Sequence, residues 1–266
     1  MVNISDIRSY INEIYPENLA FDRDNVGFLV GRSEKEVKSV LISLDVDESV
    51  ATEAAELGVD LIVSHHPLMF HPVRTMTDST PSERTLRILV KNDIGLISAH
   101  TNLDCVCGGL NDYLCKKLGI VNTKVIDVVG ETDGHVHGFG RIGELFEEIT
   151  LSDMLQRCKD TLDANGLRYT GDENKKIKSV AVNCGGGADL LNECIRLGAD
   201  LFITGDVKYN PFRDAFESDM ALIDAGHYET EHIVVELLGD VLSKQYSNLK
   251  IHISNKNIAP IKFYYK

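Results

Sequence analysis

The sequence predicts an α/β protein made of two similar halves from an internal duplication, with mostly parallel sheets. Short apolar, β-branched runs alternate with amphipathic stretches that end at glycine, a pattern typical of βαβ units. Residues 37–66 can also be laid without a gap on residues 177–206. Eight of the thirty pairs are identical, where chance would give about two. Finally, histidines and carboxylates follow three of the apolar runs, as expected at the carboxyl edge of a parallel sheet.

Each half is expected to repeat one order of elements. A helix opens each half, at 6–15 with Ser5 as its N-cap and at 153–164 with Ser152. The first half continues with strands at 27–30 and 37–44, a helix at 48–57 that ends at Gly58, and strands at 60–64, 95–98 and 124–129. The second half has the matching elements at 167–170, 177–183, 187–197 with Gly198, 200–204, 221–224 and 250–253.

The expected domain organisation is a first half at 1–129, a connecting segment at 130–149 and a second half at 150–266. Within the connecting segment, Gly130 to Gly143 could be a linker or contain a further strand through Phe139–Leu145. Its His135 and His137 are expected in a solvated loop. The glycine trio at 185–187 favours a tight strand-to-helix turn over an anion-binding loop.

Composition narrows the classes of function. The formal net charge of -14 argues against a general nucleic-acid-binding protein, because such proteins need a basic face. No apolar run approaches the length of a membrane span. Six cysteines without a CxxC pair and an N-terminus without signal-peptide character indicate a cytoplasmic protein.

Histidines and carboxylates follow three predicted strands. One apolar run ends in Ser64-His65-His66-Pro67. Two further apolar runs are each followed by a histidine and, four residues later, a carboxylate: His100 with Asp104, and His227 with Glu231. Imidazole and carboxylate at such strand ends suit a metal site.

The pattern predicts two metal ions in one site. His65 and His66 are adjacent and point to opposite sides of an extended backbone, so they can serve two ions. Asp104 and Glu231 are candidate bridging ligands, because a carboxylate has two oxygens and paired ions lie roughly 3.5–4 Å apart. Zinc, iron, manganese and magnesium all fit this donor set, and the metal identity stays open.

Several motifs resemble the NIF-three-like (YbgI) family, whose members are catalogued as GTP cyclohydrolase I type 2 homologues. They cover nearly the whole chain: residues 24–31, 64–70, 100–104 with 108–112, 138–143, 203–206 and 224–231. The resemblance implies two α/β halves around a dinuclear metal centre and a toroidal homohexamer. It also implies His65, His66, Asp104, His227 and Glu231 as metal ligands, with His100 close by.

The resemblance further implies a metal-dependent hydrolase in which metal-activated water attacks a nucleotide or a related small molecule; phosphoester hydrolysis would use the same residues. In that reaction His100 could shuttle protons, and Lys208, Arg74 or Arg141 could meet phosphates. One departure is Asn210, where the family commonly has histidine. The alternative is a non-enzymatic metal-handling or regulatory interaction protein.

The two halves are expected to contribute unequally to one site in a cleft between them. The second half has Gly205-Asp206 where the first has His65-His66, so two complete centres cannot be built from this chain.

Overall fold

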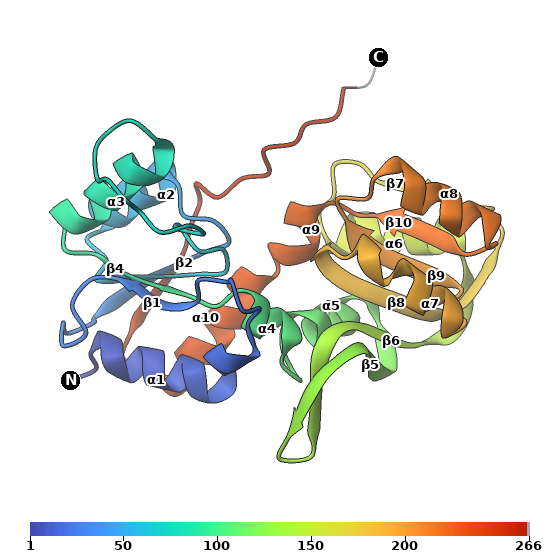
Figure 1. Cartoon of the computed structure of the whole chain (residues 1–266), viewed down its shortest axis with the longest axis horizontal. Coiled ribbons are helices and arrows are strands. Elements are labelled where there is room, and N and C mark those ends of the chain that lie inside the picture. The colour runs from blue at the N-terminus through green and yellow to red at the C-terminus, as the bar shows by residue number, and fades with distance from the viewer. Residues whose placement is uncertain (265–266) are drawn as a thin grey trace. The chain divides into compact units, whose positions relative to one another are not determined.

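The computed structural model describes residues 1–264 and divides into two compact units (Figure 1). Unit 1 contains residues 1–103 and 234–258, and unit 2 contains residues 104–233 with the residues from Ala259 on. The predicted α/β class is confirmed, since each unit contains a sheet with helices. The units divide the chain differently from the predicted boundaries at 129 and 150. The reason is that the last strand of the chain pairs with a strand of the first hundred residues.

Unit 1 is built on a five-stranded sheet of order β1-β4-β3-β2-β11, in which only β1 is antiparallel to its neighbour. Its elements are α1 (Ile4–Ile14), η1 (Glu17–Leu19), β1 (Gly27–Val30), β2 (Ser39–Ser43), α2 (Glu48–Leu57), β3 (Leu61–Ser64), α3 (Pro81–Lys91), β4 (Gly95–Ser98), α10 (Val234–Gln245) and β11 (Lys250–Ile253). In Figure 1, α2 and α3 cover one face of this sheet, and α1 and α10 cover the other.

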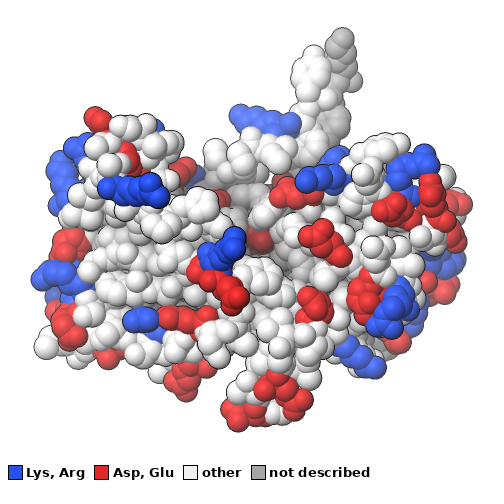
Figure 2. All heavy atoms as spheres, in the orientation of Figure 1, with Lys and Arg blue, Asp and Glu red and all other residues white. Residues whose placement is uncertain are grey.

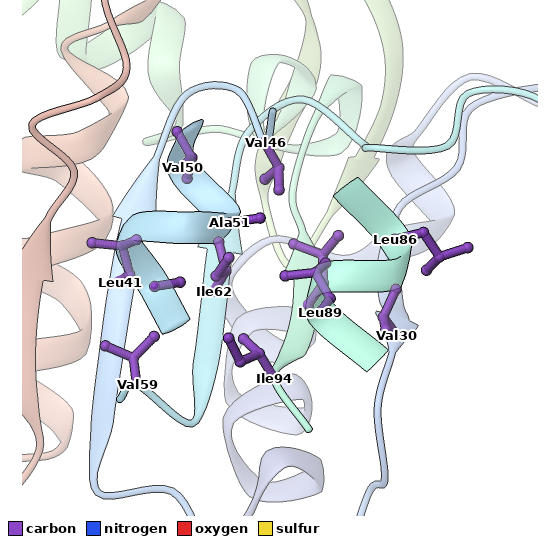
Figure 3. Packing of buried hydrophobic residues seen from close by; sticks show 12 residues of the cluster. Val30, Leu41, Val46, Val50, Ala51, Val59, Ile62, Leu86, Leu89 and Ile94 are labelled. Carbon is purple, nitrogen blue, oxygen red and sulfur yellow. The ribbon is translucent and has the colours of Figure 1, made fainter. Parts of the chain in front are cut away.

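The core of unit 1 lies between its sheet and the helices α2 and α3. Leu41 and Ile62 from the sheet pack with Val50 and Ala51 of α2 and with Leu89 of α3 (Figure 3). All five side chains are fully buried. Burying a side chain of this size contributes about 1.5–3 kcal/mol, so this layer fixes the strands whose carboxyl ends carry the histidines.

Unit 2 is built on a six-stranded mixed sheet of order β5-β6-β8-β9-β10-β7. Its elements are α5 (Leu110–Leu118), β5 (Ile120–Thr132), β6 (His135–Thr150), α6 (Leu151–Thr161), β7 (Arg168–Thr170), β8 (Lys176–Gly186), η2 (Ala188–Leu190), α7 (Leu191–Arg196), β9 (Leu201–Gly205), α8 (Tyr209–Glu217), β10 (Ala221–Asp224) and α9 (His227–Glu231). The helix α4 (Thr101–Cys105) spans the boundary between the units in the chain. Parallel pairing is confined to β8, β9 and β10.

The predicted connecting segment 130–149 is wrong as a linker, and its alternative, a further strand, is confirmed. Residues 120–132 and 135–150 form the antiparallel hairpin of β5 and β6, with a tight turn at Asp133 and Gly134. Both turn residues have positive φ, which suits the two-residue turns that join hairpin strands. Strand β6 then pairs with β8, so the segment is an integral part of the second sheet.

Local geometry repeats between the two units in the way that the sequence match predicts. Strand order and direction in β1-β4-β3-β2 match those in β7-β10-β9-β8. Val40 pairs with Leu61, and Val180, 140 residues after Val40, pairs with Leu201. The Asp60 carboxylate accepts hydrogen bonds from the amides of residues 38 and 39, and that of Asp200 from those of residues 178 and 179. These shared details support the proposed duplication.

The predicted N-caps Ser5 and Ser152 are each two residues too late. Asn3 and Thr150 cap the helices, and each forms a reciprocal capping box with an aspartate three residues on. The cap side chain accepts from the aspartate amide, while the aspartate carboxylate accepts from the cap amide. This exchange satisfies two backbone donors that the helix itself leaves unpaired, which explains the earlier start.

Among the described residues, no helix is both long and apolar enough to cross a membrane. On the face drawn in Figure 2, Lys and Arg side chains are interspersed with Asp and Glu. A nucleic-acid-binding face would instead gather its cations in one patch.

Candidate metal centre

Three histidines gather at the carboxyl edge of the sheet of unit 1. His65 and His66 directly follow β3, and His100 comes two residues after the neighbouring parallel strand β4. The ring centroids are 5.1 Å apart for His65 and His66, 5.2 Å for His65 and His100, and 5.4 Å for His66 and His100. One nitrogen from each ring lies within 4.8 Å of the other two, which is close enough for metal ligands.

Each of these imidazoles is oriented through its Nδ1 atom. Nδ1 of His66 lies 2.7 Å from Oδ1 of Asp45, and Nδ1 of His100 lies 2.9 Å from Oδ1 of Asp24. His65 uses the Ala99 carbonyl oxygen in the same way, at 2.7 Å. An acceptor at Nδ1 holds the proton there and makes Nε2 the lone-pair atom, as in the carboxylate–histidine–metal arrangement of known metal sites.

The Asp24 carboxylate binds two neighbouring residues. Besides His100, it accepts hydrogen bonds from the amide and the hydroxyl of Thr101. Burial by itself would raise the pKa of Asp24, but the hydrogen bonds from His100 and Thr101 prevail and lower that pKa to about 2. The ionised carboxylate is therefore favoured by the folded structure, and it ties the segment before β1 to the start of α4.

We expect Asp24→Asn to lower the free energy of unfolding by about 2 kcal/mol at neutral pH, because charge-assisted hydrogen bonds become neutral ones. The folded pKa lies below the ordinary value, so this contribution is complete above about pH 4 and is lost as the pH falls towards about 2. Urea titrations of wild type and variant at pH 7 and pH 3 would measure it. A stability difference that stays constant between these pH values would contradict the assignment.

In unit 2, the short helix α9 places a histidine and a glutamate one turn apart. Nε2 of His227 lies 3.0 Å from Oε2 of Glu231, and Nδ1 of His227 lies 2.7 Å from Oδ2 of Asp206. The hydrogen bond with Glu231 is the main reason that the pKa of His227 rises to about 9, with Asp206 adding to it against the opposing effect of burial. The surroundings of His227 thus strongly favour positive charge.

Two glycines let α9 approach the sheet. A Cβ atom on Gly185 would lie 2.1 Å from Oε1 of Glu231, and one on Gly205 would lie 2.7 Å from the backbone nitrogen of His227. Gly185 also has a φ of 59°, which side chains rarely adopt. The glycine run is therefore needed for close packing around Glu231. It is not an anion-binding loop, because the amides of residues 184, 185 and 187 donate to protein side chains.

Asp104 belongs to unit 2 and is 9% exposed. A carboxylate oxygen of Asp104 and one of Glu231 lie within 4.8 Å of each other. The Asn111 side chain donates to the backbone carbonyl of Asp104 at 3.0 Å, so the main chain here is fixed independently of the carboxylate. Burial raises the pKa of the nearby Cys184 thiol, and the charges of Asp104 and Glu231 raise it further.

In unit 1 the predicted residues His65, His66 and His100 lie together, and in unit 2 Glu231 lies near both Asp104 and His227. Their imidazole and carboxylate donors fit a divalent metal. The 3.0 Å between the His227 and Glu231 atoms is close to the about 3–3.5 Å that separates two ligands of one zinc ion. Mixed imidazole and carboxylate donors suit zinc, iron or manganese, and magnesium less so.

Other predicted residues are placed differently. Arg141 is 2% exposed, and its guanidinium binds Asp112 and three backbone carbonyls, so it cannot meet a phosphate. His135 and His137 lie in β6 and not in a solvated loop. His137 is buried, and its Nδ1 accepts the amide of Cys107 at 3.1 Å. This role is structural.

The sequence did not identify the carboxylates that orient the histidines. Asp24 and Asp206 occur within the motifs, but Asp45 had no assigned role. Asp24 lies three residues before β1, Asp45 two residues after β2, and Asp206 directly after β9. An aspartate within two residues of the end of a buried strand was the available signal for Asp45 and Asp206.

Comparisons with known proteins identify the family of this chain. The model of the Duf34/NIF3 (NGG1p interacting factor 3) family matches residues 2–260. Relatives named "GTP cyclohydrolase 1 type 2 homolog" include those of Clostridium perfringens, 38% identical over 98% of this chain and 100% of that protein, and Clostridium acetobutylicum, 35% identical over 98% of this chain and 99% of that protein.

Solved structures lead to the same family. A Bacillus cereus protein related to NIF3 superposes with a TM-score of 0.91 at 26% identity, covering 99% of each chain. Reduced HcgD from Methanocaldococcus jannaschii has a TM-score of 0.78 at 30% identity, covering 96% of this chain and 98% of that one. With a family match over nearly its whole length and relatives above 30% identity, the chain belongs to the Duf34/NIF3 family.

Proposed function

We propose that this protein is a dinuclear metal-dependent hydrolase. In this proposal His65, His66, Asp104, His227 and Glu231 hold two divalent ions. The first unit supplies the adjacent histidines, which the second unit lacks because Gly205 and Asp206 occupy the matching positions. A two-metal centre supplies activated water and charge stabilisation for hydrolysis.

One observation carries the proposal. His66 and His227, two of the proposed ligands, each place Nδ1 2.7 Å from an aspartate carboxylate, and a third, His65, places Nδ1 2.7 Å from the Ala99 carbonyl oxygen. Histidines that serve only as structural residues have no need of such a repeated pairing. Metal-ligating histidines almost always have a carboxylate or carbonyl partner at the other ring nitrogen, because it fixes the tautomer and raises the basicity of the ligand nitrogen.

The proposed substrate class is a nucleotide or a related small molecule. Support comes from the relatives named GTP cyclohydrolase 1 type 2 homolog. Within this chain, the residue best suited to move a proton is His100, because its Nε2 can accept or return a proton while Asp24 holds Nδ1–H. Lys208, exposed at the N-cap of α8, is a candidate phosphate contact.

We expect His100→Asn to keep the metal content of wild type and to lower kcat by about 10²–10⁴, the usual contribution of general acid–base catalysis. The variant retains a polar group next to Asp24, so folding should be little affected. Metal analysis and steady-state kinetics on the same preparation would separate the two roles. A loss of metal would instead identify His100 as a ligand.

The direct test is anaerobic purification with elemental analysis, followed by a screen of nucleotides and phosphoesters with and without each candidate metal. The proposal requires about two ions per chain and turnover that depends on them. Stoichiometric metal without turnover of any substrate would favour the alternative, a non-enzymatic metal-handling or regulatory protein.

We further infer from the family resemblance that the chain acts in the cytoplasm as a toroidal homohexamer. Light scattering of the purified protein would test the assembly: a mass near six times 29.5 kDa is expected, and a monomer would overturn it.

A further inference from the structure

We infer that Asn257, far from every sequence motif, positions the candidate metal ligand His66 by bracing Asp45. The inference rests on the proposed function, because it gives Asn257 a role in metal binding. Asn257 lies four residues after β11, in a segment without regular secondary structure, yet it is only 8% exposed.

The side chain of Asn257 makes three contacts with the turn that follows β2. Its Oδ1 accepts hydrogen bonds from the backbone amides of Leu44, at 2.8 Å, and Asp45, at 3.3 Å. Its Nδ2 donates to Oδ2 of Asp45 at 3.3 Å. Both the backbone and the carboxylate of Asp45 are thereby fixed by one residue more than two hundred positions later in the chain.

The Asp45 side chain is more exposed than the imidazole that it orients. Its side chain is 47% exposed, whereas the His66 side chain it binds is 22% exposed. The opposite oxygen, Oδ1, lies 2.7 Å from Nδ1 of His66. A half-exposed carboxylate can adopt several rotamers, and the hydrogen bond from the Asn257 amide favours the one that faces His66. The chain of contacts therefore runs from Asn257 through Asp45 to the imidazole.

The segment that carries Asn257 is anchored separately. The buried Glu53 carboxylate accepts hydrogen bonds from the Ser254 hydroxyl and from the amide of Asn255. Neither of these residues contacts Asp45 through a hydrogen bond found among the described residues. Anchoring of the segment and bracing of Asp45 thus involve different side chains, which allows them to be separated by mutation.

The second unit lacks the aspartate on which the Asn257 contacts depend. The residue that matches Asp45 there is Gly185, and its position must stay without a side chain because Glu231 occupies the space. The brace is therefore not a general requirement of the repeated fold. In this chain the Asn257 contacts hold Asp45, an aspartate that lies beyond the end of β2 and orients the His66 imidazole.

The test uses cobalt(II) as the probe on the full chain. Asn257→Ala removes all three contacts, and Asn257→Asp keeps shape and acceptor but places a second carboxylate beside Asp45. We expect both variants to bind cobalt about tenfold more weakly, which is the lower end of the loss of affinity seen when a hydrogen-bond partner of a metal ligand is removed. We also expect both to change the visible absorption of bound cobalt. Chelator competition would give the affinity, and thermal melting of the metal-free proteins would give the stability.

Ser254→Ala is the matched control, because it removes the hydrogen bonds of the Ser254 hydroxyl with Glu53 and with the Lys256 amide and leaves the side chains of Asp45 and Asn257 unchanged. It should lower the metal-free melting temperature while leaving cobalt affinity within about twofold of wild type. Wild-type affinity and spectrum in both Asn257 variants would overturn the inference, as would an equal loss of affinity in Ser254→Ala. If wild type itself binds no cobalt, the proposed metal centre fails, and the role of Asn257 fails with it.

Discussion

Asp104→Ala should lower the metal content from about two ions per chain to well below one, because a bridging carboxylate contributes an oxygen to each ion. The fold should survive. The backbone carbonyl of Asp104 keeps its hydrogen bond from Asn111, and the lost side chain leaves a buried carboxylate pair with one fewer negative charge. Elemental analysis after gel filtration would measure the metal, and far-UV circular dichroism would report the fold.

Asp127→Ala is the matched control for Asp104→Ala. Asp127 is an exposed aspartate of unit 2, and like Asp104 its charge raises the pKa of Cys105, whose main shift is due to burial. It belongs to no metal-binding group among the described residues. Its removal should leave the metal content unchanged. Full metal content in Asp104→Ala would show that Asp104 does not bridge the ions.

Metal should raise the melting temperature of wild type by about 5–10 °C when present at about a hundred times its dissociation constant. Ligand binding at that excess stabilises by about 2.7 kcal/mol, and each kcal/mol shifts a domain of this size by about 2–4 °C. We expect His66→Ala and His227→Ala each to lose most of this shift, although these residues are 161 positions apart. The reason is that the proposed centre takes its ligands from both stretches of the chain.

The quantity to compare is the difference between the melting temperatures with and without metal, measured separately for each variant. His227→Ala also removes a charged pair with Glu231, so its metal-free melting temperature changes as well. Glu229→Gln, which alters a buried carboxylate of the same helix outside the ligand set, should keep the full shift. A full shift in His227→Ala would mean that unit 2 does not contribute to the centre.

Local sequence patterns were sufficient to predict the strands and the helix that position the candidate site residues. The buried strands β3, β4 and β10 lie where apolar runs predicted them, and the helix ending at Gly58 has the left-handed glycine that was expected. Histidines at strand ends could be located because parallel strands bring their carboxyl ends to one edge. This is why His65, His66 and His100 could be grouped before their geometry was known.

Long-range pairing could not be predicted in the same way. Nothing in the pattern of residues 250–253 distinguishes a strand that completes the second half from one that joins β2, and the structure contains the latter. The role of Asp45 likewise depends on its approach to His66 across 21 residues. Such contacts are set by tertiary packing, which overrides local preference.

The division of unit 1 into two stretches of chain has a consequence for biosynthesis. Val40 of β2 pairs with Ile251 of β11, so these partners leave the ribosome 211 residues apart (251 − 40). Residues 104–233, by contrast, form the body of unit 2 without interruption. The nascent chain therefore carries an unfinished first sheet, with the β2 edge open, throughout synthesis of the second. Open strand edges invite pairing with other chains. The edge is covered only once β11 has been made.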